Sequence, residues 1–409
     1  MARHYSPKAF MIEAPNKLLK EYYELEGLNG DIPWQHLSER DIGRVFEAYE
    51  NAAEPVRRRM DNDFRDIHNL ANEGGIKTLI DVGQSQFHDT DFISVFDGAE
   101  GHVERAFIAF LNHHEAFEEA SCFHYADTLG RWRKRKRLPR MLKQPDDESK
   151  SRLSKALSDY YRQKEGRGHG CDIEYHKRDN RHYWFARPED YAVSVFIYDE
   201  QDQFDIKTQR PAFEVIFVYS ESEHSLDIRA SGPKETLLVL QTLWGRAILE
   251  CEVGAPLADS VVYELGALRS RDFQFVLEPE DGVLEVRVKR LKLKIMGSSH
   301  RVTLEASARR DPKEVYDLLE RVLKGLDVSD DVLHVASVGL QLVFPGKGTR
   351  RESTMMFDVS HPNSCSLRDE PKHLIAKNLL KRWGLDVSGS AQDDPDEPGQ
   401  PAQRVIPRS

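Results

Sequence analysis

The period of the apolar residues changes near residue 166, and this change limits the fold more than any other feature of the sequence. Before that point, apolar residues recur at spacings of three and four, which is typical of amphipathic helices. After Gly166, Gly168 and Gly170, aromatic and β-branched residues alternate with polar ones, which is typical of strands with one buried face. The sequence therefore predicts an α+β chain with a helical N-terminal region followed by a strand-rich region.

Five helices are predicted in the N-terminal region, each from an apolar stripe and a start or stop signal. They cover residues 15–26, 38–51, 55 to about 73, 103–129 and 149–164. The third helix is expected to stop at Gly74 and Gly75, because glycine is unfavourable inside a helix and common just after its end.

Strands are predicted at residues 173–175, 181–186, 191–198 and 213–219, and turn-forming residues between them favour antiparallel pairing. Further along, an order of strand, strand and helix recurs, and each helix begins near a Pro-Lys pair, at Pro233, Pro312 and Pro371. Two interpretations stay open: an internal ββα duplication, or ordinary helix-start chemistry that recurs by chance. Both predict an antiparallel sheet with helices on one face.

The strand predicted at 285–295 changes the face on which its apolar residues stand. They occupy even positions up to Val288 and odd positions from Leu291 onward. Side chains alternate between the two faces of a strand, so this change requires one extra residue. We therefore predict a β-bulge at Lys289 and Arg290.

These patterns divide the chain into a helical domain at 1–165, an antiparallel α+β domain at 170–385 and a disordered tail at 386–409, which is rich in Ser, Gly, Asp and Pro. No stretch reaches the roughly 18 apolar residues that span a bilayer, and the four cysteines form no CxxC pair. We expect a cytoplasmic protein without a membrane partner. The net charge of −11 disfavours a surface that binds nucleic acid over its whole extent.

The densest charge cluster is residues 131–143, called the basic segment below, with eight basic and no acidic residues. Such a density suits phosphate neutralisation, and a tryptophan within it can stack on a base. We expect an exposed loop here, either a contact surface for nucleic acid, another polyanion or a protein, or a connector neutralised by the chain's own carboxylates. The candidate contact residues are Arg131, Trp132, Arg133, Lys134, Arg135, Lys136, Arg137, Arg140 and Lys143.

A second candidate contact surface lies on the strand with the predicted bulge. There Arg287, Lys289, Lys292 and Lys294 alternate with apolar residues and are expected to project from the sheet. The alternative, which the pattern favours, is that they are edge-strand cations that prevent aggregation.

Two groups of potential metal ligands occur, and neither has the paired spacing of a zinc finger or the HExxH pattern. The first group is His114, Glu118 and Cys122, and the second is His169, Cys171, His176 and His182. Asp172, Glu174 and Lys177 resemble part of a nuclease-like set but lack a second anchoring acid. The sequence therefore predicts no bound metal, no cofactor and no catalytic residue.

Taken together, these features favour a non-enzymatic binding or regulatory component of a larger cytosolic assembly, with the basic segment as its main contact element. Its partner is expected to be a protein or a nucleic acid. A metal-assisted, nuclease-like hydrolase is the alternative. A subunit of a bacterial antiviral defence or mobile-element system is a further hypothesis that rests on no particular residue.

Overall fold

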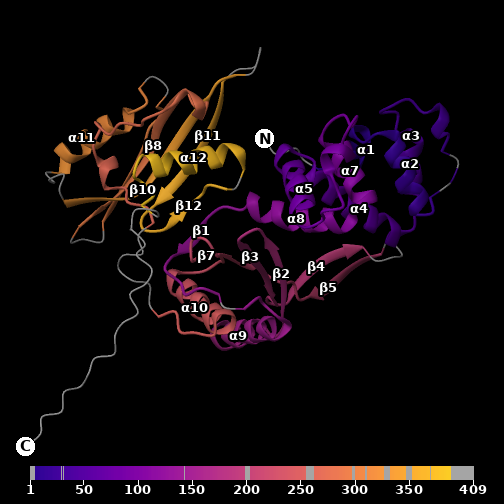
Figure 1. Cartoon of the computed structure of the whole chain (residues 1–409), viewed down its shortest axis with the longest axis horizontal. Helices are drawn as coiled ribbons and strands as arrows, with labels where there is room; N and C mark the ends of the chain where they lie inside the picture. The colour runs from indigo at the N-terminus through magenta and orange to yellow at the C-terminus, as the bar shows by residue number, and fades with distance from the viewer. Residues whose placement is uncertain are drawn as a thin grey trace, which may run out of the picture. The chain divides into compact units, whose positions relative to one another are not determined.

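The computed structural model describes residues 5–28, 30, 32–141, 143–198, 203–254, 262–296, 300–308, 311–326, 332–346, 352–368 and 370–387 (Figure 1). The chain divides into two compact units: unit 1 comprises residues 1–260 and 365–374, and unit 2 comprises 261–364 and 375–409. These units differ from the predicted domains, because the first strands belong with the N-terminal helices. Most of the predicted tail, residues 388–409, lies outside the described residues. None of the described helices is both long and apolar enough to cross a membrane.

Unit 1 begins with the predicted helical region. Its helices are α1 (Pro7–Glu13), α2 (Asn16–Leu25), α3 (Gly43–Glu50), α4 (Glu54–Leu70), α5 (Glu73–Ser85), α6 (Phe92–Val95), α7 (His102–Asn112), α8 (His114–Thr128) and α9 (Asp147–Glu165). The stripe predicted for α4, which includes Phe64 and Leu70, is buried in the core of this region. Helix α9 ends at Gly166 in the left-handed conformation, where the glycines predict its end, but it starts earlier than the predicted residue 149, at a capping box on Asp146.

Two details of the helical region differ from the prediction. Gly74 and Gly75, which were predicted to end the third helix, belong instead to the first turn of α5. The N-cap residue of α5, Asn72, accepts a hydrogen bond from the backbone N–H of Gly75. A Cβ atom at Gly75 would stand 2.1 Å from the Leu70 carbonyl oxygen, so this glycine permits a close approach of the two helices. The predicted helix at 103–129 is two helices, α7 and α8, which meet at His113.

The strands form one ten-stranded antiparallel sheet, in the order β2-β3-β6-β7-β1-β12-β11-β10-β8-β9, and a separate two-stranded sheet of β4 and β5. Their bounds are β1 (Trp132–Arg135), β2 (Cys171–Arg178), β3 (Arg181–Pro188), β4 (Val193–Tyr198), β5 (Phe204–Gln209), β6 (Val215–Ser220), β7 (Ser225–Arg229), β8 (Glu285–Ile295), β9 (Arg301–Glu305), β10 (Leu333–Phe344), β11 (Ser353–Ser360) and β12 (Ser364–Cys365). The remaining helices are α10 (Lys234–Trp244), α11 (Glu314–Leu326) and α12 (Pro371–Arg382). The α+β prediction is confirmed.

In unit 1, both faces of the sheet are covered. Tyr183 and Phe185 on β3 join the core of the N-terminal helices, whereas Trp184 between them joins a second core with α9 and α10. Figure 1 shows α9 and α10 on one side of these strands and α8 on the other. All three aromatic side chains are therefore packed, which favours core residues over the base-stacking platforms of RNA-binding sheets.

In unit 2, β8 pairs with β9 and β10, and α11 packs against β8 and β9. The predicted bulge is present, because Gly339 pairs with Arg290 and Leu340 pairs with Val288, which leaves Lys289 as the extra residue. Within the described residues, the ββα order occurs as β6-β7-α10, β8-β9-α11 and β10-β11-α12, with β12 before the last helix. Whether the order reflects duplication stays open.

Candidate functional site

The basic segment is not the exposed loop that the sequence predicts. Residues 132–135 form strand β1, which pairs with β7 in the interior of the sheet order. Trp132 is half-buried against the helical core and donates a hydrogen bond from Nε1 to the Leu129 carbonyl. Arg133 is also half-buried, and burial lowers its pKa.

Two cations of β1 are engaged within the chain. Lys134 forms ion pairs with Glu223 and, at 3.9 Å, with Asp227. Arg135 is buried and donates to the Gln241 side chain and to the carbonyls of residues 253 and 254. These two side chains therefore have structural partners, and Lys136 and Arg137 also interact within the chain. By accessibility, Arg131, Arg137, Arg140 and Lys143 are exposed and Lys136 is half-buried. The role of the segment in contacting a partner stays a prediction.

Replacing Arg135 by alanine is expected to destabilise unit 1 by roughly 1–3 kcal/mol, because it removes a buried side chain and its hydrogen bonds to the buried Gln241 side chain and to the carbonyls of Val253 and Gly254. Urea unfolding of the full chain would measure this loss. The matched change at exposed Arg140 is expected to stay within about 0.5 kcal/mol of the unmodified chain. Equal losses for the two variants would contradict the buried role of Arg135.

The second basic surface is also partly neutralised. Arg287 pairs with Glu285 at 2.5 Å, and Lys289 donates to the Ser307 carbonyl. Lys292 and Lys294 are exposed beyond the bulge. Their part in binding stays a prediction.

The two predicted groups of metal ligands do not assemble as groups. His114 and Glu118 form a surface pair at 3.4 Å. His182 is completely buried; its Nδ1 lies 2.7 Å from the Tyr175 hydroxyl and its Nε2 lies 2.6 Å from a Glu221 oxygen. Burial also raises the pKa of the Cys171 thiol to about 12.

The environment of His182 predicts a pH dependence of stability. Burial lowers its pKa below the ordinary value, although the Glu221 carboxylate opposes this shift. The unfolded chain therefore takes up the proton first, so this contribution to stability is complete above about pH 6.5 and is lost as the pH falls through the folded pKa. Unfolding free energies measured between pH 7 and pH 5 should fall less steeply for His182→Gln than for the unmodified chain. Parallel slopes would contradict this assignment.

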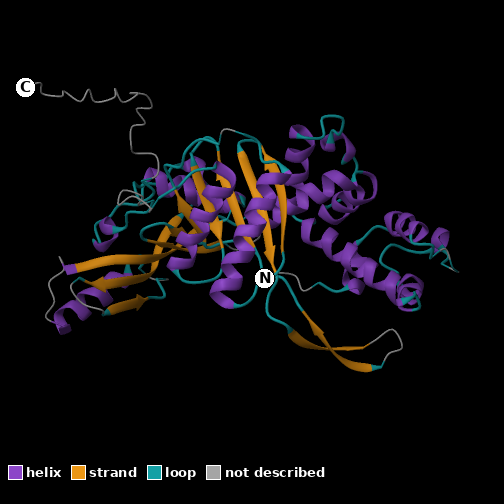
Figure 2. Ribbon diagram, turned by 90° about the horizontal axis from the view of Figure 1, so that it is seen from below, coloured by secondary structure: helices purple, strands orange, loops and turns teal. Residues whose placement is uncertain are grey.

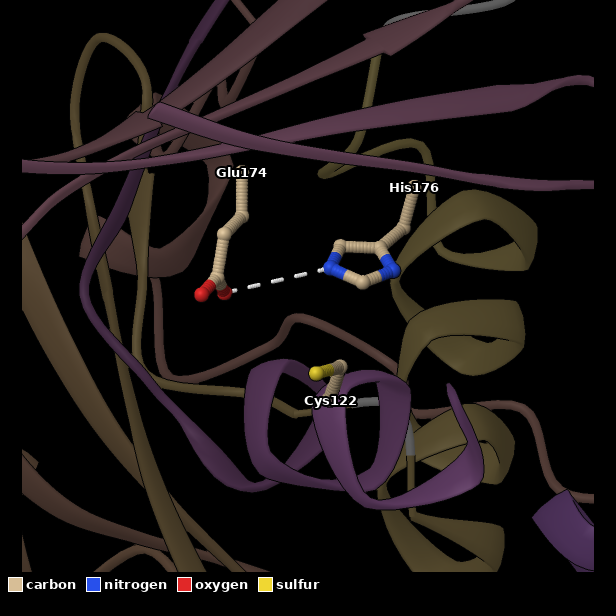
Figure 3. A group of neighbouring side chains, drawn as sticks. All are labelled: Cys122, Glu174 and His176. Carbon is tan, nitrogen blue, oxygen red and sulfur yellow. Dashed lines mark ion pairs between the residues drawn. The ribbon is translucent and has the colours of Figure 1, made fainter. Parts of the chain in front are cut away.

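One residue from each of these two groups, Cys122 and His176, lies close to the carboxylate of Glu174 in unit 1. The Sγ of Cys122, a carboxylate oxygen of Glu174 and a ring nitrogen of His176 lie within 4.8 Å of one another (Figure 3). Cys122 projects from α8, and the other two residues stand two apart on β2, hence on one face of the strand. We call these three residues the Cys–Glu–His cluster.

Further contacts hold the Cys–Glu–His cluster in place. Glu119, three residues before Cys122 on α8, lies 2.7 Å from the Nδ1 of His176. The guanidinium of Arg187 contacts both oxygens of Glu174, at 2.7 and 2.8 Å. The Nε2 of His176 is buried, lies 4.0 Å from Glu174 and has no hydrogen-bond partner among the described residues.

The cluster favours positive charge. Burial alone would lower the pKa of His176, but Cys122 and Glu119 outweigh it and raise the pKa to about 10. Helix α8 is fixed to β2 beside the cluster by Arg178, which contacts the two Asp127 oxygens at 2.8 Å each.

The separate sheet of β4 and β5 forms a second candidate site, which we call the aromatic hairpin. Phe196 pairs with Ile206, and Tyr198 pairs with Phe204, so all four side chains share one face. Their exposed fractions are 75% for Phe196, 72% for Tyr198, 59% for Phe204 and 53% for Ile206. Figure 2 shows this two-stranded ribbon projecting from the rest of unit 1.

The root of the aromatic hairpin is anchored, although its strands are exposed. Arg167 forms ion pairs with Glu165 at 2.6 Å and Asp190 at 2.8 Å, and its guanidinium lies 3.9 Å from the centre of the Phe213 ring. The Tyr191 hydroxyl donates to the Glu165 carbonyl. The hairpin is therefore presented in a defined direction from the body of unit 1.

The chain matches no known protein family model and no curated protein. The candidate sites therefore rest on the geometry alone. Sequence reasoning missed the hairpin and the cluster as sites. The signals available were the pairs Glu119 with Cys122 and Glu174 with His176, each at a spacing that places both members on one face.

Proposed function

We propose that the protein is a binding component of a larger assembly and that the aromatic hairpin docks into an apolar cleft of a partner protein. The observation that carries this proposal is the uncharged face of Phe196, Tyr198, Phe204 and Ile206, each more than half exposed. A two-stranded hairpin is marginally stable by itself, and exposed apolar patches on a folded protein mark contact sites.

The area of the hairpin favours a cleft over stacking against a second copy. An aromatic side chain has about 150–250 Å² of surface that can be buried. With the exposed fractions given above, the four side chains of the face together leave roughly 500 Å² of apolar surface in solvent. A stable interface needs about 800 Å² from each partner. A cleft that encloses the hairpin would also cover Val195 and Ile197, which are half-buried on the opposite face, and would approach that area.

The charge of the hairpin favours a protein over a polyanion. The residues that join β4 to β5, 199–202, read Asp-Glu-Gln-Asp in the sequence, although they lie outside the described residues. Asp205 and Lys207 follow on the exposed strand, so residues 193–209 carry four carboxylates and one lysine. This excess of negative charge repels phosphate and favours lysine and arginine in the partner. The expected cleft is therefore apolar along its walls and carries basic residues.

A photoreactive phenylalanine analogue at position 196 would test this proposal in cells that naturally produce the protein. The matched control is the same analogue at Ile93 on α6, which is 61% exposed and lies outside the hairpin. We expect one adduct with a different protein from position 196 and none from position 93. The purified partner, mixed with the purified chain, should give the same adduct.

Other adducts would overturn the proposal. An adduct between two copies of this chain would mean that the hairpin binds a second copy and not a different protein. A nuclease-sensitive adduct would replace it by nucleic acid and would restore the polyanion hypothesis. Equal adducts from positions 196 and 93 would show that the hairpin has no special role.

A further inference from the structure

We propose that Cys122, Glu174 and His176 bind a zinc-class divalent metal ion. A thiol, a carboxylate and an imidazole converge here from α8 and β2, with their donor atoms within 4.8 Å of one another. Thiol and imidazole donors select zinc and similar transition metals, whereas magnesium and calcium prefer sites made only of oxygen. The site is independent of the aromatic hairpin, and its test does not depend on the partner.

His176 is oriented as a metal ligand should be. Its Nδ1 lies 2.7 Å from Glu119, and this carboxylate accepts the ring proton there, so that Nε2 is the nitrogen that would exchange its proton for an ion. Nε2 is buried without a hydrogen-bond partner among the described residues. A metal ion between Nε2, Cys122 and Glu174 would satisfy this nitrogen.

The distances require a modest contraction. In a tetrahedral zinc site with bonds of about 2.0–2.3 Å, the donor atoms lie roughly 3.3–3.6 Å apart. The donors of the cluster lie up to 4.8 Å apart, so they would have to approach one another by as much as roughly 1.2–1.5 Å. Side-chain rotations of Cys122 and Glu174 can supply this change. Arg187 would keep its contact with Glu174, as ligating carboxylates usually retain hydrogen bonds.

Three protein ligands leave one position of a tetrahedral ion open. Glu174 is the most exposed member of the cluster, with 44% of its side chain accessible, so solvent reaches the site from that side. Water or a donor from another molecule would occupy the fourth position, as in catalytic zinc sites. Such an ion is also what the hydrolase alternative requires.

Cobalt titration of the chelator-treated full chain tests the site without an activity assay. We expect one cobalt ion for each chain and a sulfur-to-cobalt charge-transfer band, which zinc abolishes by displacement. Cys122→Ser should lose the band, whereas Cys251→Ser should keep it. Glu119→Gln should keep the band but weaken the affinity by about 10–100-fold, because Glu119 positions His176 without touching the ion.

Alkylation of the unmodified chain gives a second test that needs no variant. Zinc should slow the reaction of iodoacetamide with Cys122 and leave Cys251, which is also partly accessible, unaffected. The proposal is overturned if the unmodified chain gives no charge-transfer band, if the band persists in Cys122→Ser, or if zinc does not change the alkylation of Cys122. If iodoacetamide reacted rapidly with Cys122 and zinc did not change the rate, Cys122 and His176 would instead form a reactive thiolate–imidazolium pair.

Discussion

Replacing Phe196 and Phe204 together by serine is expected to weaken binding of the partner protein by about a thousandfold or more, while the stability of the chain changes little. Buried aromatic anchors at interfaces each contribute about 2 kcal/mol or more when they are removed, and about 1.4 kcal/mol corresponds to a tenfold change in affinity. Both side chains are more than half exposed in the isolated chain, so folding does not depend on them. Calorimetric titration and urea unfolding measure the two quantities separately.

The matched control for this variant is Ile93→Ser, an exposed apolar residue on α6. It should leave both the affinity and the stability unchanged. If the hairpin variant lost stability in parallel with affinity, the aromatic face would be part of the folded core. If neither quantity changed, the partner would bind elsewhere.

Replacing Asp127 by alanine is expected to destabilise unit 1 by about 3–5 kcal/mol, because it leaves the largely buried guanidinium of Arg178 unpaired. Both contacts of this ion pair are 2.8 Å long, and Arg178 also donates to the Tyr183 hydroxyl. A typical domain is stable by only about 5–15 kcal/mol, so the loss would be a large fraction of the total. Denaturant unfolding followed by circular dichroism would measure it.

The surface pair of Arg246 and Glu252 provides the control, since both of its side chains are more than half exposed. Arg246→Ala should change stability only slightly, because solvent screens exposed ion pairs. A second comparison is Asp127→Leu with Arg178→Met, which replaces both charges and should recover much of the lost stability. If the double change were as harmful as Asp127→Ala, the loss would not come from an unpaired charge.

The sequence was sufficient wherever neighbouring residues decide the structure. The bulge at Lys289 follows from the change of face between Val288 and Leu291, and the end of α9 follows from Gly166. These features depend on alternation, capping and the conformational freedom of glycine. All of them can be read within a few residues.

Strand β1 could not be predicted in this way. Its sequence, Trp-Arg-Lys-Arg, has no alternation of apolar residues, and Arg135 is buried only because acceptors more than 100 residues later surround its guanidinium. The exposure of the aromatic hairpin could not be predicted either. The alternation at Phe196 and Tyr198 resembles that of a core strand, and nothing local reveals that no core covers them.

The Cys–Glu–His cluster combines both difficulties. Cys122 shares a helix face with Glu118 and His114, so sequence spacing grouped it with residues that lie apart from the cluster. Its neighbours Glu174 and His176 come from a strand about 50 residues later. Only the packing of α8 on β2, fixed by the contact of Arg178 with Asp127, brings the donors together.

Amide hydrogen exchange of the hairpin strands, residues 193–198 and 204–209, is the most direct test of the docking role. In the isolated chain these amides should exchange much faster than those of the sheet core, because a two-stranded hairpin opens easily. When the partner protein identified by cross-linking is bound, the exchange of these amides should slow more than that of any other surface segment. Unchanged exchange in the hairpin, with protection appearing at the basic segment or elsewhere, would contradict the proposed docking site.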